Sequence, residues 1–590
     1  MEQVEKMRHT LSHVLAAAVQ ELYPTTIFGV GPAIENGFYY DIDFDGEKVS
    51  DSDLGRIEKK MRGLIQRKLE MRERQVSREE ALAWAKDQGQ KYKIELIEEL
   101  PVDEEITFYD MVDPKDGKVI FTDLCKGPHL SNLSEVGVFK LKRVAGAYWR
   151  GDEKREMLTR IYGVAFSTAD GLTEYEQKQE EAKKRDHRKL GKELDLFCYS
   201  ELVGSGLPLF TPRGTVLRDK LNEFTQGYRT ACGYRKVTIP HIANVELYKT
   251  SGHYEKFPEL FQFVSQESGD HLAIKPVSCP HHSQIFASMP RSYKELPVKY
   301  LETTMVYRDE RKGELGGLSR VRSITQDDSH IFCTEDQVEQ VFGELIESAK
   351  DLYKKVNMKL RLRLSFRDDG DGYIGDEKMW EKAQTAIKKM ADEFKMEYTV
   401  AEGEAAMYGP KMDFMATDAL GREWQLATVQ LDYALPERFD LEYTDADGGK
   451  KRPIMVHAAL LGAIERFMSI YIEHTAGWFP MWCAPEMVRL ITVNSDAIDY
   501  AKEVEQALAG VVLEKPIVRN EMRYETDYSD DSLGKKIRRA TNLKIPVILV
   551  VGPKDAQNHT VSIRLQDSEE VVKLNDLQDW LKEKGENIYK

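Results

Sequence analysis

The sequence predicts a multidomain α+β protein, and three observations support this fold class. The chain has 590 residues, far more than the roughly 100 to 150 of a typical domain, so several hydrophobic cores are expected. Strand-like and helix-like segments are mixed in the first part, a long strand hairpin lies in the middle, and short strands alternate with helices in the last part. We therefore expect four segments of different architecture, at residues 1–165, 166–193, 194–485 and 486–590.

Composition and charge exclude several classes of protein. Hydrophobic residues make up 41% of the chain but form no run long enough to cross a membrane, and the N-terminus lacks a signal-peptide core. We therefore expect a cytoplasmic protein with no membrane partner. A formal net charge of -16 argues against a protein that coats nucleic acid without specificity, although local basic patches are compatible with it. Six cysteines in so long a chain indicate reduced thiols or metal ligands rather than a disulfide framework.

Residues 1–165 are expected to form an α+β domain. A helix that begins near Glu5 would place His9 and His13 on one face, because residues four apart are neighbours on a helix. A strand follows in ENGFYYDIDF, and a charged, helical stretch is expected over residues 51–80.

A second pair of metal-type ligands lies in the segment FTDLCKGPHL, where Cys125 and His129 are also four apart. Three imidazoles and a thiol could form a tetrahedral zinc site, although the spacing is not that of a zinc finger. A helix that carries two unrelated histidines is an equally good interpretation of the first pair alone. Spacing by itself leaves both interpretations open.

Residues 166–193 are expected to form a spacer. The run TEYEQKQEEAKKRDHRKLGKE has no proline, a single glycine and dense opposite charges. This composition is typical of an exposed helix, which would join the first domain to the next.

The central feature of residues 194–485 is a predicted hairpin from Thr303 to Thr334, with a glycine-rich loop between two strands. Side chains of residues two apart lie on the same face of a strand, so each strand would carry several polar and charged side chains on one face. These residues are Arg308 and Glu310 on the first strand, and Arg320, Arg322, Gln326, Asp328 and His330 on the return strand. The solvated face of an ordinary hairpin is one explanation. A triphosphate site is the other, because guanidinium forks bind phosphate oxygens bidentately.

Further candidate residues flank this hairpin. Cys279 precedes it, in SCPHH. After it, GREWQLATVQLD predicts a strand whose alternation points Gln425 and Gln430 to opposite faces, so we expect a bulge or a twist between them, or only one of them facing the substrate. The run VHAALLGAIERFMSIYIEH predicts a helix with an apolar face, which carries His457 and Arg466.

Taken together, these motifs resemble those of the class II aminoacyl-tRNA synthetases, and TQDDSHIF in the hairpin is similar to the threonyl-tRNA synthetase family of bacterial type. The resemblance implies an ATP-dependent ligase that converts L-threonine to threonyl-adenylate and transfers the threonyl group to tRNA(Thr), with Mg2+ accompanying ATP. The hairpin would be motif 2, the helix with Arg466 motif 3, and the segment around Pro240 motif 1, which implies a homodimer. The class II core implies an antiparallel sheet with helices.

The resemblance also implies roles for individual residues of the catalytic domain. Those expected to bind ATP and support catalysis are Arg308, Glu310, Arg320, Gln425, Thr428 and Arg466. Those expected to bind threonine are Gln326, Asp328, Tyr408, Lys411 and Gln430. His253 would lie near the 3′ end of the tRNA. Cys279, His330 and His457 would bind one catalytic Zn2+ per subunit, whereas the neighbouring His281 and His282 are left out of the ligand set.

The two terminal segments resemble further domains of the same family. HxxxH, CxxxH and the run AGAYWRGD resemble its editing domain, which is related to that of alanyl-tRNA synthetases and hydrolyses mischarged seryl-tRNA(Thr). The editing residues implied are His9, His13, Lys93, Asp123, Cys125 and His129. The family commonly has a small TGS domain before this one, and we expect it to be absent because His9 lies so near the start. Residues 486–590 resemble an anticodon-binding α/β domain, in which Arg564 would approach an anticodon base.

The expected zinc ligands and the editing domain together favour threonine as the substrate. An apolar pocket separates isosteres such as threonine and valine only by a factor on the order of 100, whereas a Zn2+ that accepts both the amino and the hydroxyl group leaves valine with an unmatched coordination position. Serine keeps both groups and lacks only a methyl, a deficit worth roughly 1 to 3 kcal/mol. A second, hydrolytic site is then required.

Two alternatives compete with this interpretation. A synthetase for another amino acid, such as proline or serine, is disfavoured by the three expected zinc ligands. A synthetase-like RNA-binding regulator without catalysis is disfavoured because Arg308, Glu310 and Arg466 are all present.

Overall fold

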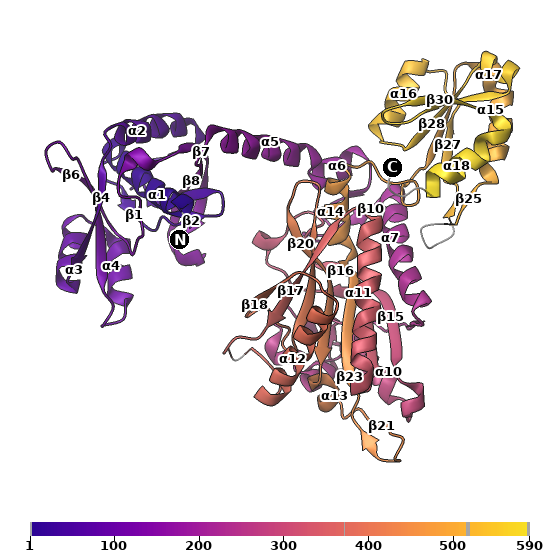
Figure 1. The fold of residues 1–590 in the computed structure, drawn as a ribbon, viewed down its shortest axis with the longest axis horizontal. Helices are drawn as coiled ribbons and strands as arrows, with labels where there is room; N and C mark the ends of the chain where they lie inside the picture. The colour runs from indigo at the N-terminus through magenta and orange to yellow at the C-terminus, as the bar shows by residue number, and fades with distance from the viewer. Residues whose placement is uncertain (1–2, 371, 515–519, 587–590) are drawn as a thin grey trace. The chain divides into compact units, whose positions relative to one another are not determined.

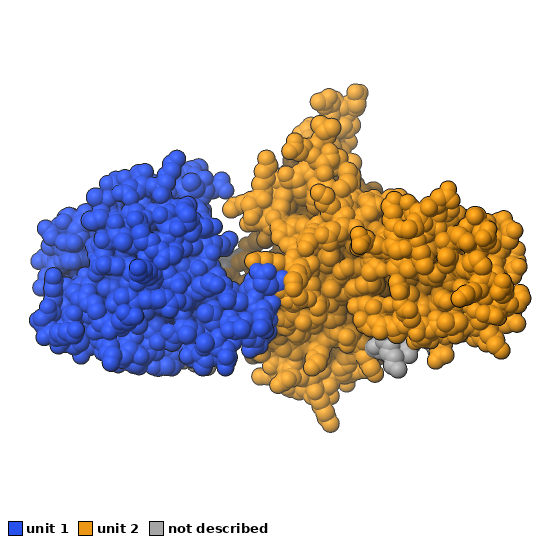
Figure 2. Space-filling model, turned by 90° about the horizontal axis from the view of Figure 1, so that it is seen from above, with its two compact units in different colours: residues 1–180 blue, residues 181–590 orange. Residues whose placement is uncertain are grey.

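The structure, a computed structural model, describes residues 3–370, 372–514 and 520–586 and divides into two compact units. Unit 1 comprises residues 1–180 and unit 2 residues 181–590, coloured blue and orange in Figure 2. Each unit combines helices with sheets of mainly antiparallel strands, which confirms the predicted multidomain α+β class. None of the helices in the described ranges is both long and apolar enough to cross a membrane.

In unit 1, helix α1 (Gln3–Leu22) packs on a five-stranded sheet (Figure 1). Its residues Leu11, Leu15 and Val19 recur every four positions and are fully buried, as an amphipathic helix requires. The sheet has the order β1-β3-β8-β7 with β2 paired to β3, and a second sheet has the order β4-β5-β6. The strands are β1 (Ile27–Phe28), β2 (Ala33–Ile34), β3 (Gly37–Asp43), β4 (Glu70–Val76), β5 (Ile106–Val112), β6 (Val119–Leu124), β7 (Val138–Tyr148) and β8 (Met157–Phe166). The other helices are α2 (Leu54–Gln66), α3 (Arg78–Asp87) and α4 (Lys91–Glu99).

The prediction of one helical stretch over residues 51–80 is only partly correct. Helix α2 is followed by strand β4, and α3 begins after Ser77, whose side chain accepts a hydrogen bond from the backbone of Glu80 in a capping box. Strand β4 lies at the edge of its sheet with most of its charged side chains exposed. Dense charge therefore marks an exposed edge strand here and not a helix.

The spacer forms two helices, where one was expected: α5 (Ala169–Arg185) and α6 (His187–Glu193). The break lies at Asp186, whose carboxylate accepts a hydrogen bond from the backbone of Arg188 and thereby starts α6. Helix α5 buries none of its residues, as expected of an exposed helix. Helix α6 instead buries His187, Leu190 and Gly191.

Unit 2 is built on an eight-stranded sheet in the order β11-β15-β16-β23-β20-β19-β17-β18 (Figure 1). Its six central strands pair antiparallel, which confirms the predicted class II architecture, and its two edge pairings are parallel. The strands are β11 (Arg235–Lys236), β15 (Val298–Tyr307), β16 (Ser323–Cys333), β17 (Lys359–Phe366), β18 (Tyr398–Glu402), β19 (Lys411–Thr417), β20 (Glu423–Asp432) and β23 (Ile454–Ala463).

One face of this sheet forms the main hydrophobic core. Helices α7 (Pro212–Ala231), α11 (Val338–Lys355), α12 (Glu377–Glu393) and α14 (Ile464–His474) bury apolar side chains in it. On β16, Ile331 and Cys333 belong to this core, whereas Asp328 and His330 alternate with them and point to the opposite face. The candidate site is built on that opposite face.

Smaller elements surround the sheet. They are β9 (Phe197–Cys198), β10 (Leu209–Phe210), β12 (Ile242–Asn244), α8 (Val245–Ser251), α9 (His253–Lys256), β13 (Gln262–Val264), β14 (His271–Ile274), α10 (Cys279–Ala287), α13 (Ala434–Arg438), β21 (Tyr443–Thr444) and β22 (Lys450–Lys451). Helix α10 is the one that matters for the site, because it begins at Cys279.

The prediction of a single helix that carries both His457 and Arg466 is wrong. Residues 454–463 form strand β23, and α14 begins only at Ile464. A strand buried on both faces reads as a continuous run of apolar and small residues, and this run is rich enough in Ala and Leu to look helical. His457 therefore lies within the sheet.

The last part of unit 2 contains a five-stranded sheet in the order β27-β24-β28-β29-β30. Strand β24 pairs parallel with both neighbours and the other pairings are antiparallel, which confirms the predicted mixed α/β sheet. The strands of this sheet are β24 (Val488–Thr492), β27 (Tyr524–Asp527), β28 (Val547–Val551), β29 (Thr560–Arg564) and β30 (Glu569–Lys573), while β25 (Val512–Leu513) and β26 (Asn520–Glu521) pair with each other. The helices are α15 (Ile498–Ala509), α16 (Leu533–Asn542), α17 (Pro553–Asn558) and α18 (Leu577–Glu586).

Candidate active site

A row of cross-strand neighbours carries much of the candidate site in unit 2. His330 on β16 faces His457 on β23, which faces Gln430 on β20, which in turn faces Lys411 on β19. Facing side chains of antiparallel strands lie about 5 Å apart, so sheet register alone brings these four residues together. They come from distant parts of the sequence.

Cys279, His330 and His457 converge at one end of this row. One potential ligand atom from each lies within 4.8 Å of the other two, and all three side chains are buried. Burial raises the pKa of the Cys279 thiol and lowers the pKa of His330. A thiolate and two neutral imidazoles form a donor set that suits Zn2+ and leaves coordination positions open.

The surroundings of His457 fit a metal ligand. Its Nε2 lies 2.8 Å from Oδ2 of the fully buried Asp432. Since a carboxylate only accepts, Nε2 carries a proton, and Nδ1 is the ring nitrogen that remains for a metal. Carboxylates in this position are usual partners of metal-binding histidines.

His282, which the sequence analysis set aside, lies directly beside the metal-type cluster. Its Nδ1 is 2.7 Å from Nδ1 of His330, and its Nε2 is 3.7 Å from Oε2 of Glu302. It is not part of the three-residue ligand group, so leaving it out of the ligand set is consistent with the structure. Sheet register places Glu302 opposite Asp328, but no spacing in the sequence indicates that His282 on α10 reaches His330.

The residues expected to bind threonine lie around the same row. The Tyr408 hydroxyl donates to Oε1 of Gln430 at 2.6 Å, and its ring stacks on His457 with centroids 4.5 Å apart. Asp328 is buried, which raises its pKa, and Gln326 lies two residues before it on β16. The four side chains therefore lie on one wall.

The structure brings Lys411 and His253 to the same region. Lys411 Nζ is 3.4 Å from Oδ2 of Asp413. His253 is buried at the start of α9, and its ring centroid is 6.4 Å from that of Tyr408. Burial lowers the pKa of His253 to about 3, so its imidazole is neutral.

The expected bulge between Gln425 and Gln430 is confirmed. The register of β20 against β19 shifts at Phe414, so that one residue of β20 is skipped. As a result, Gln425 Nε2 and Thr428 Oγ1 both donate to the same oxygen of Asp413, at 2.8 and 3.0 Å.

The guanidinium groups of Arg308 and Arg466 are arranged so that they could bind an anion. Arg308 and Arg466 pack over the rings of Phe257 and Trp424, and in the described part of the chain the Nε atom of each is buried without a hydrogen-bond partner. Burial lowers the pKa of both groups. Donors held in this way suit phosphate oxygens, which would supply both the charge and the hydrogen bonds.

Arg320 and Glu310 differ from the predicted arrangement. Strand β15 ends at Tyr307, so Arg308 and Glu310 do not share a strand face. Arg320 also precedes its strand, and its guanidinium forms ion pairs with Glu310 at 2.7 Å and Glu314 at 2.9 Å. The glycine-rich loop is longer than expected, because β15 ends at Tyr307 and β16 begins only at Ser323. Within this segment, Arg320 pairs with two carboxylates.

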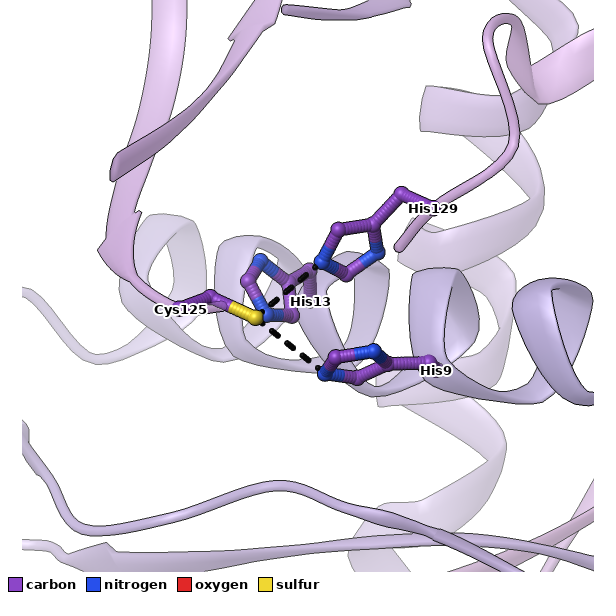
Figure 3. Close-up of side chains that lie close together, drawn as sticks. All are labelled: His9, His13, Cys125 and His129. Carbon is purple, nitrogen blue, oxygen red and sulfur yellow. Dashed lines mark hydrogen bonds between the residues drawn. The ribbon is translucent and has the colours of Figure 1, made fainter. Parts of the chain in front are cut away.

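In unit 1, the four metal-type residues point toward one another (Figure 3). His9 and His13 come from α1, and Cys125 and His129 from the segment after β6. The Cys125 sulfur lies 3.3 Å from Nε2 of both His9 and His129. Burial lowers the pKa of all three imidazoles and raises that of the Cys125 thiol to about 12.

Lys93 and Asp123 complete this second cluster. Both are buried, Lys93 Nζ donates to Oδ1 of Asp123 at 2.6 Å, and Nε2 of His13 is 3.7 Å from Oδ2 of the same carboxylate. All six residues expected to take part in editing are thus side by side. Arg564, the expected anticodon residue, lies on β29 and pairs with Glu569 on β30, and its role stays a prediction.

Three family models match the chain. They are "tRNA synthetase class II core domain (G, H, P, S and T)" over residues 261–475, "Anticodon binding domain" over residues 487–584, and "Threonyl and Alanyl tRNA synthetase second additional domain" over residues 106–162. The first contains the cluster of Cys279, His330 and His457, and the third contains Cys125 and His129.

Solved structures with a similar fold include the RNA-binding domain of threonyl-tRNA synthetase from Cryptosporidium parvum, at a TM-score of 0.63 and 33% identity over 68% of this chain and 98% of that one. Prolyl-tRNA synthetase of Giardia lamblia, at a TM-score of 0.54 and 16% identity over 68% of this chain and 76% of that one, shares the fold alone.

Curated relatives match over nearly their whole length. A threonine–tRNA ligase of Gloeobacter violaceus is 48% identical over 573 residues, which cover 95% of this chain and 89% of that protein. A threonine–tRNA ligase of Synechococcus elongatus is 46% identical over 95% of this chain and 92% of that protein. With this identity over 95% of its length, the chain belongs to the threonyl-tRNA synthetase family.

Proposed function

We propose that this protein is a threonine–tRNA ligase that activates L-threonine with ATP and Mg2+, transfers the threonyl group to tRNA(Thr), and hydrolyses seryl-tRNA(Thr). The observation that carries the proposal is the convergence of Cys279, His330 and His457 within 4.8 Å in a chain of this family. A purely apolar pocket would separate a hydroxyl from a methyl group only by a factor on the order of 100.

Selection of threonine depends on the cluster of potential metal ligands in unit 2. When bound by Cys279, His330 and His457, one Zn2+ per subunit would supply open coordination positions for the amino and hydroxyl groups of the amino acid. Asp432 holds the His457 ring in the orientation that a ligand needs. The Tyr408–Gln430 pair and the buried Asp328 lie beside this cluster and would limit the size of the side chain that is admitted.

Activation needs charge stabilisation rather than a reactive protein group. Arg308 and Arg466 have buried, unsatisfied donors that phosphate oxygens would satisfy. Because these groups are fixed before ATP binds, they stabilise the charge that develops as pyrophosphate leaves without a reorganisation cost. His253, held neutral by burial, would lie near the terminal ribose that accepts the threonyl group.

Editing would take place in unit 1. Neutral imidazoles accept hydrogen bonds, so His9, His13 and His129 are able to hold a water molecule beside an ester. The buried ion pair of Lys93 and Asp123 fixes one side of the cluster. Hydrolysis there removes the serine that the catalytic core admits.

We also propose a homodimer in the cytoplasm. The small sheet of β12, β13 and β14, which follows Pro240, exposes Ile242, Phe263 and Val264. An exposed apolar face of this kind is typical of an interface, and it lies in the segment expected to be motif 1.

Amino-acid-dependent exchange of pyrophosphate into ATP tests the function, with threonine, serine, valine and proline compared alongside metal analysis. We expect strong exchange with threonine, weaker exchange with serine, very little with valine or proline, and one zinc per chain. Exchange with proline and none with threonine would show a different synthetase. Binding of tRNA without any exchange would instead indicate an RNA-binding regulator.

A further inference from the structure

A buried histidine outside the predicted site joins the expected ATP-binding elements of unit 2. His187 is the first residue of α6 and is 7% exposed. Its backbone N–H donates to Oε1 of Glu473 at 3.1 Å, and its Nδ1 lies 2.7 Å from the same oxygen. On the other side of the ring, Nε2 accepts the backbone N–H of Leu318 at 3.1 Å.

These contacts define the protonation of the ring. Because the Leu318 N–H is a donor, Nε2 of His187 must be unprotonated, and the single proton of the neutral imidazole must sit on Nδ1, where Glu473 accepts it. The second carboxylate oxygen of Glu473 accepts from Arg422 at 2.6 Å, and Arg422 also pairs with Asp418 at 2.6 Å. The imidazole is therefore held in one orientation by a chain of charged partners.

The two elements that His187 connects both carry expected ATP ligands. Leu318 lies two residues before Arg320, in the loop between β15 and β16. Glu473 lies seven residues after Arg466 on α14, so both occupy the same side of that helix. A hydrogen bond through His187 thus ties the backbone of the loop to the helix.

The backbone of the loop lies directly against the imidazole. Gly317 has a φ of 56°, and a Cβ atom built there would lie 2.2 Å from Nε2 of His187. On another side, Gly317 and Arg322 line a cavity of about 650 Å³. The loop backbone is thus held against the His187 ring at Gly317 and by the hydrogen bond from Leu318.

We propose that His187 is a positioning residue, whose Nε2 holds the loop at residues 311–322 in the conformation that binds ATP. This rests on the proposed function and on the expected binding of ATP by Arg320 of the loop and Arg466 of α14. His187 itself touches no substrate. Its loss is expected to weaken ATP binding and to leave threonine binding unchanged, because the residues expected to bind threonine lie on β16, β19, β20 and the segment just before β19, outside this loop.

Two amide variants separate the two hydrogen bonds of the ring. His187→Gln places an acceptor near Nε2 and retains the bond from Leu318, whereas His187→Asn places its amide near Nδ1, retains the bond to Glu473 and leaves the Leu318 N–H without a partner. In threonine-dependent pyrophosphate exchange, we expect His187→Asn to raise the KM for ATP about threefold to tenfold, the factor expected for one lost hydrogen bond. The KM for threonine should change less than twofold, and His187→Gln should stay within about twofold of the wild type in both constants.

A second measurement on the full chain tests the contact between His187 and the loop without relying on enzyme activity. Hydrogen exchange followed by mass spectrometry should show faster exchange of the peptide that contains Leu318 in His187→Asn and wild-type exchange in His187→Gln. An unchanged KM for ATP in His187→Asn, or an equal rise for ATP and threonine, would overturn the proposal. Absence of exchange activity in the wild type would instead refute the proposed function, while hydrogen exchange would still decide whether His187 holds the loop.

Discussion

Asp432 determines the protonation of His457 through contacts that hold each of its oxygens. Its Oδ1 accepts the backbone N–H groups of Ala434 and Leu435, at 2.7 and 2.9 Å, and its Oδ2 faces His457. The carboxylate is therefore anchored by the start of α13 before it contacts the imidazole. This anchoring allows the orientation of the ring to be tested with a substitution that preserves the fold.

Replacement of Asp432 by asparagine should weaken zinc binding about tenfold to a hundredfold. The amide oxygen keeps the two backbone contacts, but the amide nitrogen turns a donor toward Nε2 of His457, so the ring proton moves to Nδ1 and blocks the metal-binding lone pair. Competition with a chromogenic chelator measures the affinity. Asp440→Asn, at an exposed carboxylate nearby, is the matched control and should bind zinc like the wild type.

Replacement of Cys279 by serine should abolish zinc retention and threonine activation together, because a hydroxyl is a far poorer ligand than a thiolate for this ion. Metal analysis and threonine-dependent pyrophosphate exchange on the same preparation check both effects. Cys198→Ser, at an exposed thiol, should change neither quantity. Threonine activation by zinc-free Cys279→Ser would contradict the ligand role.

At the scale of elements, α1 carries two imidazoles, one buried and one half-buried. It carries His9 and His13, which meet His129, and burial lowers the pKa of all three. In the unfolded chain each would titrate near about 6.5. The unfolded state therefore binds more protons than the folded state below that pH, and unfolding becomes more favourable as the pH falls.

We therefore expect α1 to lose protection from hydrogen exchange between pH 7.5 and pH 5, after correction for the intrinsic exchange rates. The stability of this region should be complete above about pH 6.5 and should decline below it. Helix α15 contains no histidine, and its buried apolar residues pack in a separate cluster around β24, β28 and α18, so it serves as the internal reference and should change less. Equal pH dependence of the two helices would contradict the assignment of neutral, buried imidazoles to α1.

At the scale of the whole molecule, the two sites lie in separate compact units. Substitutions in one site that share no partners with the other should have independent effects. The double variant His9→Ala with His13→Ala should therefore charge tRNA(Thr) with threonine at the wild-type rate, while seryl-tRNA(Thr) accumulates. Deacylation of preformed seryl-tRNA(Thr) measures the loss directly.

The thermal unfolding profile of this double variant is the necessary control, because His13 is buried and its removal leaves a cavity. A variant that folds and still deacylates seryl-tRNA at the wild-type rate would remove the editing role from these histidines. A parallel loss of threonine charging would show that the two units are coupled.

Several parts of the architecture could be predicted from the sequence. The pairs His9 and His13, and Asp328 and His330, share a face because helix and strand periodicities depend only on local bond geometry. The expected bulge near Gln425 followed from the same alternation. The prediction of a helix around His457 was wrong. A strand that is buried on both faces shows no alternation of polar and apolar residues, so the sequence does not distinguish it from a buried helix.

By itself, the sequence determined the fold class, the order of the domains and the short-range pairs, because these depend on composition and on residues within one or two turns of each other. Only the tertiary structure decided which of these pairs meet. The contacts of His457 with Asp432, of His282 with His330, and of Leu318 with His187 arise from sheet register and helix packing between distant segments. No local periodicity encodes such a contact, because it exists only once the hydrophobic core has brought the strands and helices into place.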